Sequence, residues 1–201
     1  MKERVLIIGS GGHAKIVIDI LELTKEYEIF GIVTNDDIES FCGYKVLGND
    51  NVLGKLFKKG ITKVAMGIGG FRNNNIRTII FNKLKKINFD IINVIHPTAV
   101  ISQSVSLGEG NVIFAGVIIN SEVQIKNNCI VATGSSIDHE TILNNHCLIS
   151  AGVTIGAGAV LNQGVLCALG SNIISAITIG ENVLVAAGAT VVSSFWYTCK
   201  T

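Results

Sequence analysis

The sequence predicts two domains: a small α/β domain of the nucleotide-binding type (residues 1–94), followed by an all-β parallel β-helix (residues 95–201). Three observations predict this arrangement. The chain opens with a strand, a glycine-rich turn and a helix; its second half repeats aliphatic residues with a period of six; and its charge pattern changes between the two halves. Residues 1–93 hold 14 Lys/Arg and 10 Asp/Glu, whereas residues 94–201 hold two Lys/Arg and five Asp/Glu.

The first element is an apolar strand over residues 5–8, followed directly by Gly9-Ser-Gly-Gly-His-Ala14. An amphipathic helix follows over residues 15–23. Glycines allow a close approach of the backbone to a phosphate, and the first turn of a helix offers unpaired N–H groups to an anion. This segment is therefore typical of a nucleotide-binding βαβ unit.

Three more strands are expected in this half, over residues 29–33, 63–66 and 91–94, with a helix over residues 76–87. Polar or glycine-rich segments follow the second and third of the four strands, at residues 34–37 and 67–75. Strands that alternate with helices indicate a parallel sheet, whose ligands bind at the carboxyl ends of the strands.

The glycine-rich turn allows more than one interpretation. It fits a tight strand-to-helix connection, and Gly9-x-Gly11-x-x-Ala14 also fits the loose dinucleotide pattern, with Asp36 or Asp37 near the position of a ribose-binding acid. His13, however, places a bulky ring where the pyrophosphate of a dinucleotide would lie. The turn is better suited to a nucleotide sugar or a similar phosphorylated ligand.

In the second half, every sixth residue from Ile101 to Val191 is aliphatic, apart from one cysteine. The series is Ile101, Leu107, Ile113, Ile119, Ile125, Val131, Ile137, Leu143, Ile149, Ile155, Leu161, Cys167, Ile173, Ile179, Val185 and Val191. A period of six fits neither an amphipathic helix nor simple alternation, and it is typical of a hexapeptide β-helix. Three hexads would make one triangular coil, giving about five coils.

The segment Asp138-His139-Glu140 interrupts a face that otherwise carries small and uncharged residues. A neutral imidazole can act as a general base, and a neighbouring carboxylate can fix its tautomer. The alternative is a solvated polar corner. His146 is expected at the surface or at a subunit contact, and without a second convergent histidine we expect no metal site.

Composition argues against several classes of protein. A net charge of +1 gives no general attraction to nucleic acid. Five cysteines without a CxxC pair, and the absence of signal-peptide anatomy, favour a cytoplasmic protein with reduced thiols. Residues 147–180 carry no charged side chain, but their unbroken period of six argues against a membrane span.

Both halves together resemble the bacterial sugar O-/N-acetyltransferases of the sialic-acid and bacillosamine pathways, the NeuD/PglD-like hexapeptide-repeat family. The resemblance covers nearly the whole chain. It depends most on three motifs, which are Gly9-Ser-Gly-Gly-His-Ala-Lys15, Ile95-His-Pro-Thr-Ala-Val100 and Ser135-Ser-Ile-Asp-His-Glu140. Members of this family carry a Rossmann-like domain before a left-handed β-helix.

The resemblance implies an acetyl-CoA-dependent acetyltransferase, without a metal, that acts on an amino group or hydroxyl of a sugar or sugar nucleotide in surface glycan biosynthesis. It implies a homotrimer that binds acetyl-CoA between adjacent β-helices. His139 would be the general base and Glu140 its orienting partner. The implied substrate contacts are Gly11, Gly12, His13, Asn35, Asp36, Gly69 and Asn75. The implied acetyl-CoA contacts are Leu148, Leu169 and Ala187, with backbone N–H groups near Ala157 and Gly158 stabilising the oxyanion.

The chain departs from the family at three places, since Leu148 stands where members often have a second histidine, Ala157 replaces a common glycine, and residues 192–201 differ from the family's closing segment. A non-catalytic, degenerate hexapeptide protein therefore stays as an alternative. A nicotinamide-dependent oxidoreductase is a further alternative, although the sequence shows no residues arranged for hydride transfer.

Overall fold

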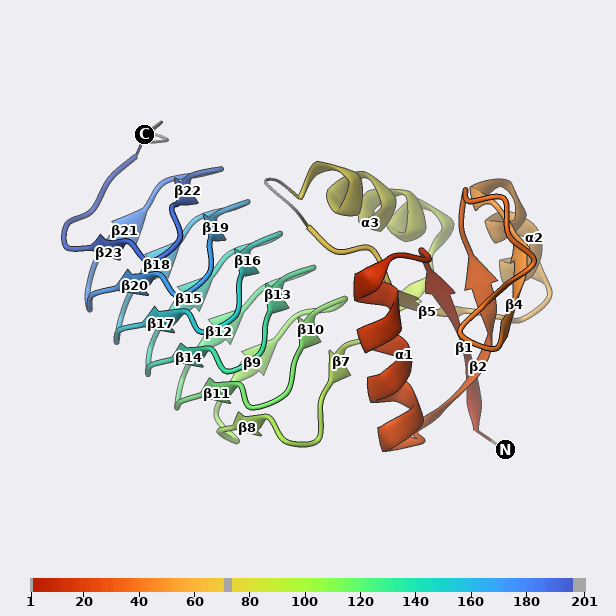
Figure 1. Ribbon diagram of the computed structural model, residues 1–201, viewed down its shortest axis with the longest axis horizontal. Coiled ribbons are helices and arrows are strands. Elements are labelled where there is room, and N and C mark those ends of the chain that lie inside the picture. Colours follow the sequence, from red (N-terminus) through yellow and green to blue (C-terminus); the bar gives the residue numbers. More distant parts are fainter. Residues whose placement is uncertain (1, 71–73, 197–201) are drawn as a thin grey trace.

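The computed structural model describes residues 2–70 and 74–196, and it contains the two expected parts in the expected order (Figure 1). The α/β part contains three helices and one sheet, and the β-helix consists of short coils stacked on one another. Helices α1 and α3 face one side of this stack (Figure 1). The expected fold class, an α/β domain followed by a left-handed parallel β-helix, is confirmed.

The N-terminal sheet has the order β3-β4-β2-β1-β5-β6. All its neighbouring strands are parallel except β3 and β4, which form an antiparallel hairpin. The bounds of its strands are β1 Glu3–Ile8, β2 Tyr27–Val33, β3 Ser40–Phe41, β4 Tyr44–Gly48, β5 Lys63–Met66 and β6 Asp90–Ile91. The central strand β1 is buried from Val5 to Ile8, as expected of a parallel strand covered on both faces.

The helices are α1 Gly12–Thr24, α2 Leu53–Lys58 and α3 Asn75–Ile87, with a 3₁₀ turn at Asp50–Val52. Helix α1 begins three residues earlier than its amphipathic pattern suggests, because the glycine-rich turn already enters the first helical turn. The hairpin β3–β4 and α2 have weak periodicity, and the sequence did not predict them. The expected strand over residues 91–94 is wrong in one respect. Residues 90–91 form β6 of the first sheet, whereas Val94–Ile95 form β7 of the β-helix.

The β-helix has three parallel sheets, here called D, E and F, and strands that pair within a sheet are three hexads apart, as in Val112↔Ile130. Sheet D contains β7 Val94–Ile95, β10 Val112–Ile113, β13 Ile130–Val131, β16 Leu148–Ile149, β19 Leu166–Cys167 and β22 Leu184–Val185. Sheet E contains β8 Val100–Ile101, β11 Ile118–Ile119, β14 Ser136–Ile137, β17 Thr154–Ile155, β20 Asn172–Ile173 and β23 Thr190–Val191. Sheet F contains β9 Ser106–Leu107, β12 Gln124–Ile125, β15 Ile142–Leu143, β18 Val160–Leu161 and β21 Thr178–Ile179.

The sixth-residue aliphatic side chains fill the interior of the β-helix. From Ile113 to Val185 they are buried, together with the small or β-branched residues that precede each strand. The corners of the β-helix need a left-handed backbone. Glycine occupies most of these corner positions, and Asn, Glu, His or Ala occupies the others. The predicted coil of three hexads is therefore the repeating unit of the structure.

The outer face of sheet D is apolar, and the N-terminal domain covers it. Val112, Ile130, Leu148 and Leu166 form one buried cluster with residues of α1 such as Val17 and Leu21. The two parts of the chain therefore share a hydrophobic core, which fixes the glycine-rich turn beside the β-helix.

Candidate active site

The glycine-rich turn places the first turn of α1 beside open space. Gly11 is the N-cap of α1, and no side chain caps the helix or adds a negative charge to its first turn. A Cβ atom on Gly11 or Gly12 would meet no described atom within 4 Å. The unpaired N–H groups and the positive end of the helix dipole are therefore free for an anionic group such as a phosphate.

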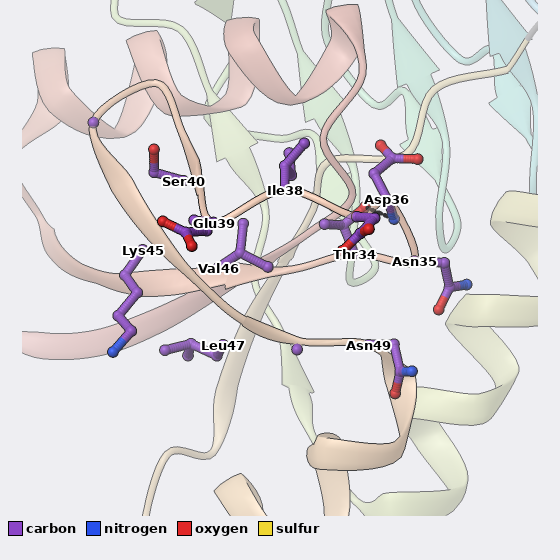
Figure 2. Close-up of a pocket in the computed structure, with 13 residues that line it drawn as sticks. Thr34, Asn35, Asp36, Ile38, Glu39, Ser40, Lys45, Val46, Leu47 and Asn49 are labelled. Atoms are coloured by element: carbon purple, nitrogen blue, oxygen red, sulfur yellow. Dashed lines mark hydrogen bonds between the residues drawn. The ribbon is translucent and has the colours of Figure 1, made fainter.

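Asn35 and Asp36 lie in a pocket of about 900 Å³ at the carboxyl end of β2. Figure 2 shows that its lining side chains come from the segment after β2 and from the β3–β4 hairpin. The hydroxyl of Ser10 hydrogen-bonds to Thr34 Oγ1 at 2.7 Å and donates to Asp36. These contacts join the glycine-rich turn to the pocket, so Gly11, Gly12, Asn35 and Asp36 belong to one continuous region.

His13 does not point freely into this region. Its ring stacks on Phe114 of the β-helix with centroids 5.4 Å apart, and it packs against Gly69, where a Cβ would lie 3.0 Å from His13 Cβ. Burial, together with the positive charge of Arg77, lowers the pKa of His13 to about 3. The imidazole is therefore neutral at physiological pH.

The sequence interpretation missed Arg77, which the structure places at the centre of the seam between the domains. Arg77 lies on the apolar face of α3 with Ile80, Phe81 and Leu84, and its side chain is fully buried. A charged residue in phase with an apolar stripe was the signal that could have identified it.

Asn75 does not line the pocket that contains Asn35 and Asp36. It is the first residue of α3, and it lines a second pocket of about 440 Å³ together with His146, Gln163 and Asn182 of the β-helix corners. His146 contacts Phe81 edge-on, and burial and Arg77 lower its pKa. The expected surface position of His146 is thus an intramolecular contact with α3.

His139 and Glu140 occupy the corner between β14 and β15. His139 Nδ1 lies 3.0 Å from Glu140 Oε2, and the two side chains are 51% and 63% exposed. Glu140 has a left-handed backbone, with φ of 59°, as other corner residues of the β-helix do. A carboxylate only accepts hydrogen bonds, so this contact places the proton of the neutral ring on Nδ1 and leaves Nε2 free as a base.

Hydrogen bonds fix the side chain before this pair and the backbone of the pair itself. Asp138 accepts hydrogen bonds from Asn120 Nδ2 at 2.9 Å and from the His139 amide at 2.8 Å, and these contacts lower its pKa. One coil further on, the Gly158 amide donates to the His139 carbonyl at 2.9 Å. Gly158 is therefore not the free oxyanion donor that we expected. Among the described residues no acceptor pairs with the amide of Ala157.

The three expected acetyl-CoA positions do not all share one surface. Leu169 and Ala187 lie one coil apart at the corners between sheets D and E, and Leu169 is 62% exposed. Leu148 lies on sheet D and is only 7% exposed beneath the N-terminal domain. The D–E corners are also a different edge of the β-helix from the E–F corner that carries His139.

The described residues offer a paired imidazole and carboxylate on one corner of the β-helix and an open helix start on the α/β domain. Within residues 2–70 and 74–196 there is no cluster of three or more His, Cys, Asp or Glu side chains suited to a metal ion. No helix in the described ranges is long and apolar enough to cross a membrane. The fold and site define a hexapeptide-repeat acyltransferase with an N-terminal nucleotide-binding domain.

Comparison with known proteins identifies the family. The model of the PglD N-terminal domain matches residues 4–84. The structure of PerB from Caulobacter crescentus, solved with CoA and GDP-perosamine, is 33% identical, has a TM-score of 0.64, and is matched over 92% of this chain and 90% of its own. The chain therefore belongs to the PglD-like family of sugar acetyltransferases.

Two other relatives agree with this assignment. UDP-N-acetylbacillosamine N-acetyltransferase of Bacillus subtilis (strain 168) is 28% identical over 113 residues, which cover 54% of this chain and 50% of that protein. The match thus spans about half the length of the curated relative. The acetyltransferase domain of PglB from Neisseria gonorrhoeae FA1090, at 24% identity and a TM-score of 0.69, supports the same fold over 94% of this chain and 96% of its own.

Proposed function

We propose that this protein transfers the acetyl group of acetyl-CoA to an amino group of a nucleotide-activated sugar, for surface glycan biosynthesis. The observation that carries the proposal is the His139–Glu140 pair, whose 3.0 Å contact leaves Nε2 unprotonated on an exposed corner. Relatives that are named for N-acetylation of nucleotide sugars favour nitrogen over oxygen as the acceptor atom.

In the proposed reaction, His139 Nε2 removes a proton from the amine as the nitrogen attacks the thioester carbonyl of acetyl-CoA. The C–N bond forms, the C–S bond breaks, and the proton passes from His139 to the departing thiolate. Glu140 holds the ring in the required tautomer and stabilises the imidazolium that forms. The amide of Ala157, one coil beyond the base, would donate to the oxyanion.

The N-terminal domain would bind the nucleotide part of the acceptor. The N–H groups at Gly11 and Gly12 are suited to the diphosphate, since they begin a helix and face open space. Asn35 and Asp36 would contact the ribose or the base in the adjoining pocket. Gly69 packs against the ring of His13, and Asn75 would contact the acceptor from the second pocket, at the start of α3.

A complete site would need more than one chain, because His139, the D–E corners and the glycine-rich turn lie at different edges of one molecule. We propose a homotrimer in which the E–F corner of one β-helix faces the D–E corners of its neighbour. Acetyl-CoA would then lie along Leu169 and Ala187, close to the neighbouring His139. Reduced thiols at the four described cysteines fit the cytoplasm as the location of this assembly.

The test is release of free thiol from acetyl-CoA by the purified protein, offered a panel of UDP- and GDP-linked amino sugars, free sialic acid and CMP-sialic acid. We expect release with one amino-sugar nucleotide, and a loss of at least a hundredfold in kcat for His139→Ala because the general base is removed. Binding of acetyl-CoA and the oligomeric state should stay unchanged. A His139→Ala variant with most of its activity would overturn the assignment of the base.

A further inference from the structure

Arg77 is a fully buried cation, and its hydrogen bonds connect two domains. Its Nη1 donates to the carbonyls of Ile68 at 2.6 Å and Met66 at 3.3 Å, at the end of β5. Its Nη2 donates to Gly110 at 2.8 Å and its Nε to Asn128 at 3.4 Å, both at corners of the β-helix. The guanidinium thus fills a gap between domains with donors aimed in both directions.

This arrangement is costly, because no carboxylate within the described ranges pairs with the charge. Burial lowers the pKa of Arg77 to about 9, and the group still carries its charge at neutral pH. If Arg77 only filled the space between the domains, an apolar residue would give a more stable protein. We therefore infer that the position of the guanidinium N–H groups has a role beyond packing.

The same guanidinium reaches the glycine-rich turn. Arg77 Nη1 lies 3.5 Å from His13 Nε2. The guanidinium therefore lies against the Nε2 edge of the ring and holds that edge at the seam between the domains. Nδ1 lies on the side of Gly69, a residue with no side chain to cover it.

We propose that Arg77 is a positioning residue of the nucleotide-sugar site, which fixes the ring of His13 and the end of β5 against the β-helix and so holds the glycine-rich turn in place for the substrate. The inference rests on the proposed binding of the nucleotide at the glycine-rich turn. It assigns Arg77 no contact with the reacting atoms. Its effect should therefore appear in substrate binding and not in the chemical step.

The groups around His13 support this role. Arg77 on α3 is the charged group that faces the ring, and Phe114 of the β-helix covers one ring face. The Met66 carbonyl beside the ring favours the protonated form, but Arg77 Nη1 also donates to that oxygen. On α1 itself, Lys15 and Asp19 are exposed.

The first experiment needs neither substrate nor an Arg77 variant. Nitrogen-15 NMR of the intact protein, with the His13 signals assigned by their loss in His13→Gln, should show a neutral ring throughout pH 5–8. A ring that is protonated at pH 5 would overturn the proposal. This result does not depend on enzymatic activity, so it separates the inference from the proposed function.

The second experiment uses Arg77→Lys, which keeps the charge but has no forked donor set, and Arg77→Met, which keeps the length alone. The control is Arg4→Met, which removes the other described arginine, whose guanidinium stacks on Phe30 away from the seam. KM for the amino-sugar nucleotide should rise about tenfold in Arg77→Lys, as expected when one positioned donor is displaced, while kcat and KM for acetyl-CoA change less than about twofold.

If the enzyme turns over none of the amino-sugar nucleotides, isothermal titration calorimetry can measure the affinity of each variant for GDP and UDP instead. Weaker nucleotide binding by folded Arg77→Lys, with Arg4→Met unchanged, supports the proposal, and unchanged binding overturns it. If Arg77→Met also folds, the pKa of its His13 should rise because the facing charge is gone. A His13 pKa that stays the same in Arg77→Met would contradict the assigned contact.

Discussion

At the scale of single residues, the candidate base depends on one short contact. Glu140 lies at a left-handed corner of the β-helix, and its carboxylate is 3.0 Å from His139 Nδ1. The pair lies on an exposed corner, where an ion pair alone would contribute little to stability. Its value is therefore in orienting the imidazole.

Replacing Glu140 with Gln should reduce kcat without unfolding the protein. The amide can still accept from Nδ1–H, but it has no charge to stabilise the imidazolium that forms, so we expect a reduction of about ten- to a hundredfold. Steady-state kinetics measures this loss, and circular dichroism checks the fold. A Glu140→Gln enzyme with a wild-type kcat would show that the carboxylate charge has no role.

His13 makes the stability of the protein depend on pH. Its pKa is about 3 in the folded protein, against 6.5 for the ordinary side chain. As the pH falls below 6.5 the unfolded chain takes up a proton that the folded protein does not, so stability is lost progressively toward pH 3. The slope approaches about 1.4 kcal/mol per pH unit for one proton.

Urea unfolding between pH 7.5 and 4 measures this slope. His13→Gln should unfold with a smaller dependence on pH, whatever its absolute stability, because an amide does not titrate. His146 shifts in the same direction and will leave part of the slope in place. An identical slope in wild type and His13→Gln would mean that the folded protein does not lower the pKa of His13.

At the scale of elements, the β-helix was the part most open to prediction. Each hexad repeats the same choice of an inward aliphatic residue and a turn-prone neighbour, so sixteen positions supported one another and the coil length followed. The hairpin β3–β4 and helix α2 are short and have no such repetition. The boundary near residue 94 is also difficult, since β6 and β7 are separated by only two residues yet belong to different sheets.

The candidate site was predicted unevenly for the same reason. His139, Glu140 and the glycine-rich turn are local motifs, and the structure shows a His–Glu contact and an open helix start. Arg77 depends on contacts with residues 9–64 positions away, which no local pattern specifies. Likewise, Gly158 donates to the carbonyl of His139 in the preceding coil, a pairing that becomes visible only when the coils are stacked.

The side chain of Ile137, in strand β14, should contribute strongly to the free energy of unfolding of the β-helix. It pairs with Ile119 and Ile155 of the adjacent coils and is fully buried. We expect Ile137→Ala to cost about 2–5 kcal/mol, the usual range for truncation of a packed core side chain. Thermal or urea unfolding measures this cost, and the exposed Thr154→Ala of the next coil is the control, with an expected change within about 0.5 kcal/mol. Equal stability of both variants would contradict a continuous packed interior.

At the scale of the whole molecule, the two domains depend on each other. The outer face of sheet D is apolar where α1 covers it, and the shared cluster includes Ile130. A β-helix without its N-terminal domain would expose that apolar face to water. Single apolar residues on a surface are normal, but a contiguous apolar face is rarely left exposed.

Placing a charge in this seam should therefore unfold both domains together. Ile130→Asp introduces an unpaired carboxylate among apolar side chains, so we expect a loss of at least about 3 kcal/mol and one shared unfolding transition. Differential scanning calorimetry measures the transition, and Ile118→Asp is the control because Ile118 is partly exposed on sheet E. Two separate transitions in the wild-type protein would contradict the shared core.

The coil length also sets which changes in chain length the protein tolerates. Removing three hexads between equivalent corners, such as residues 159–176, would join Gly158 to Ile177 in the same backbone state and shorten the stack by one coil. Removing a single hexad would rotate every later strand onto the next sheet. Apolar outward side chains such as Leu166 would then leave the covered face and become exposed. Insertions and deletions in this half should therefore occur in whole coils, so that its length changes in steps of one coil.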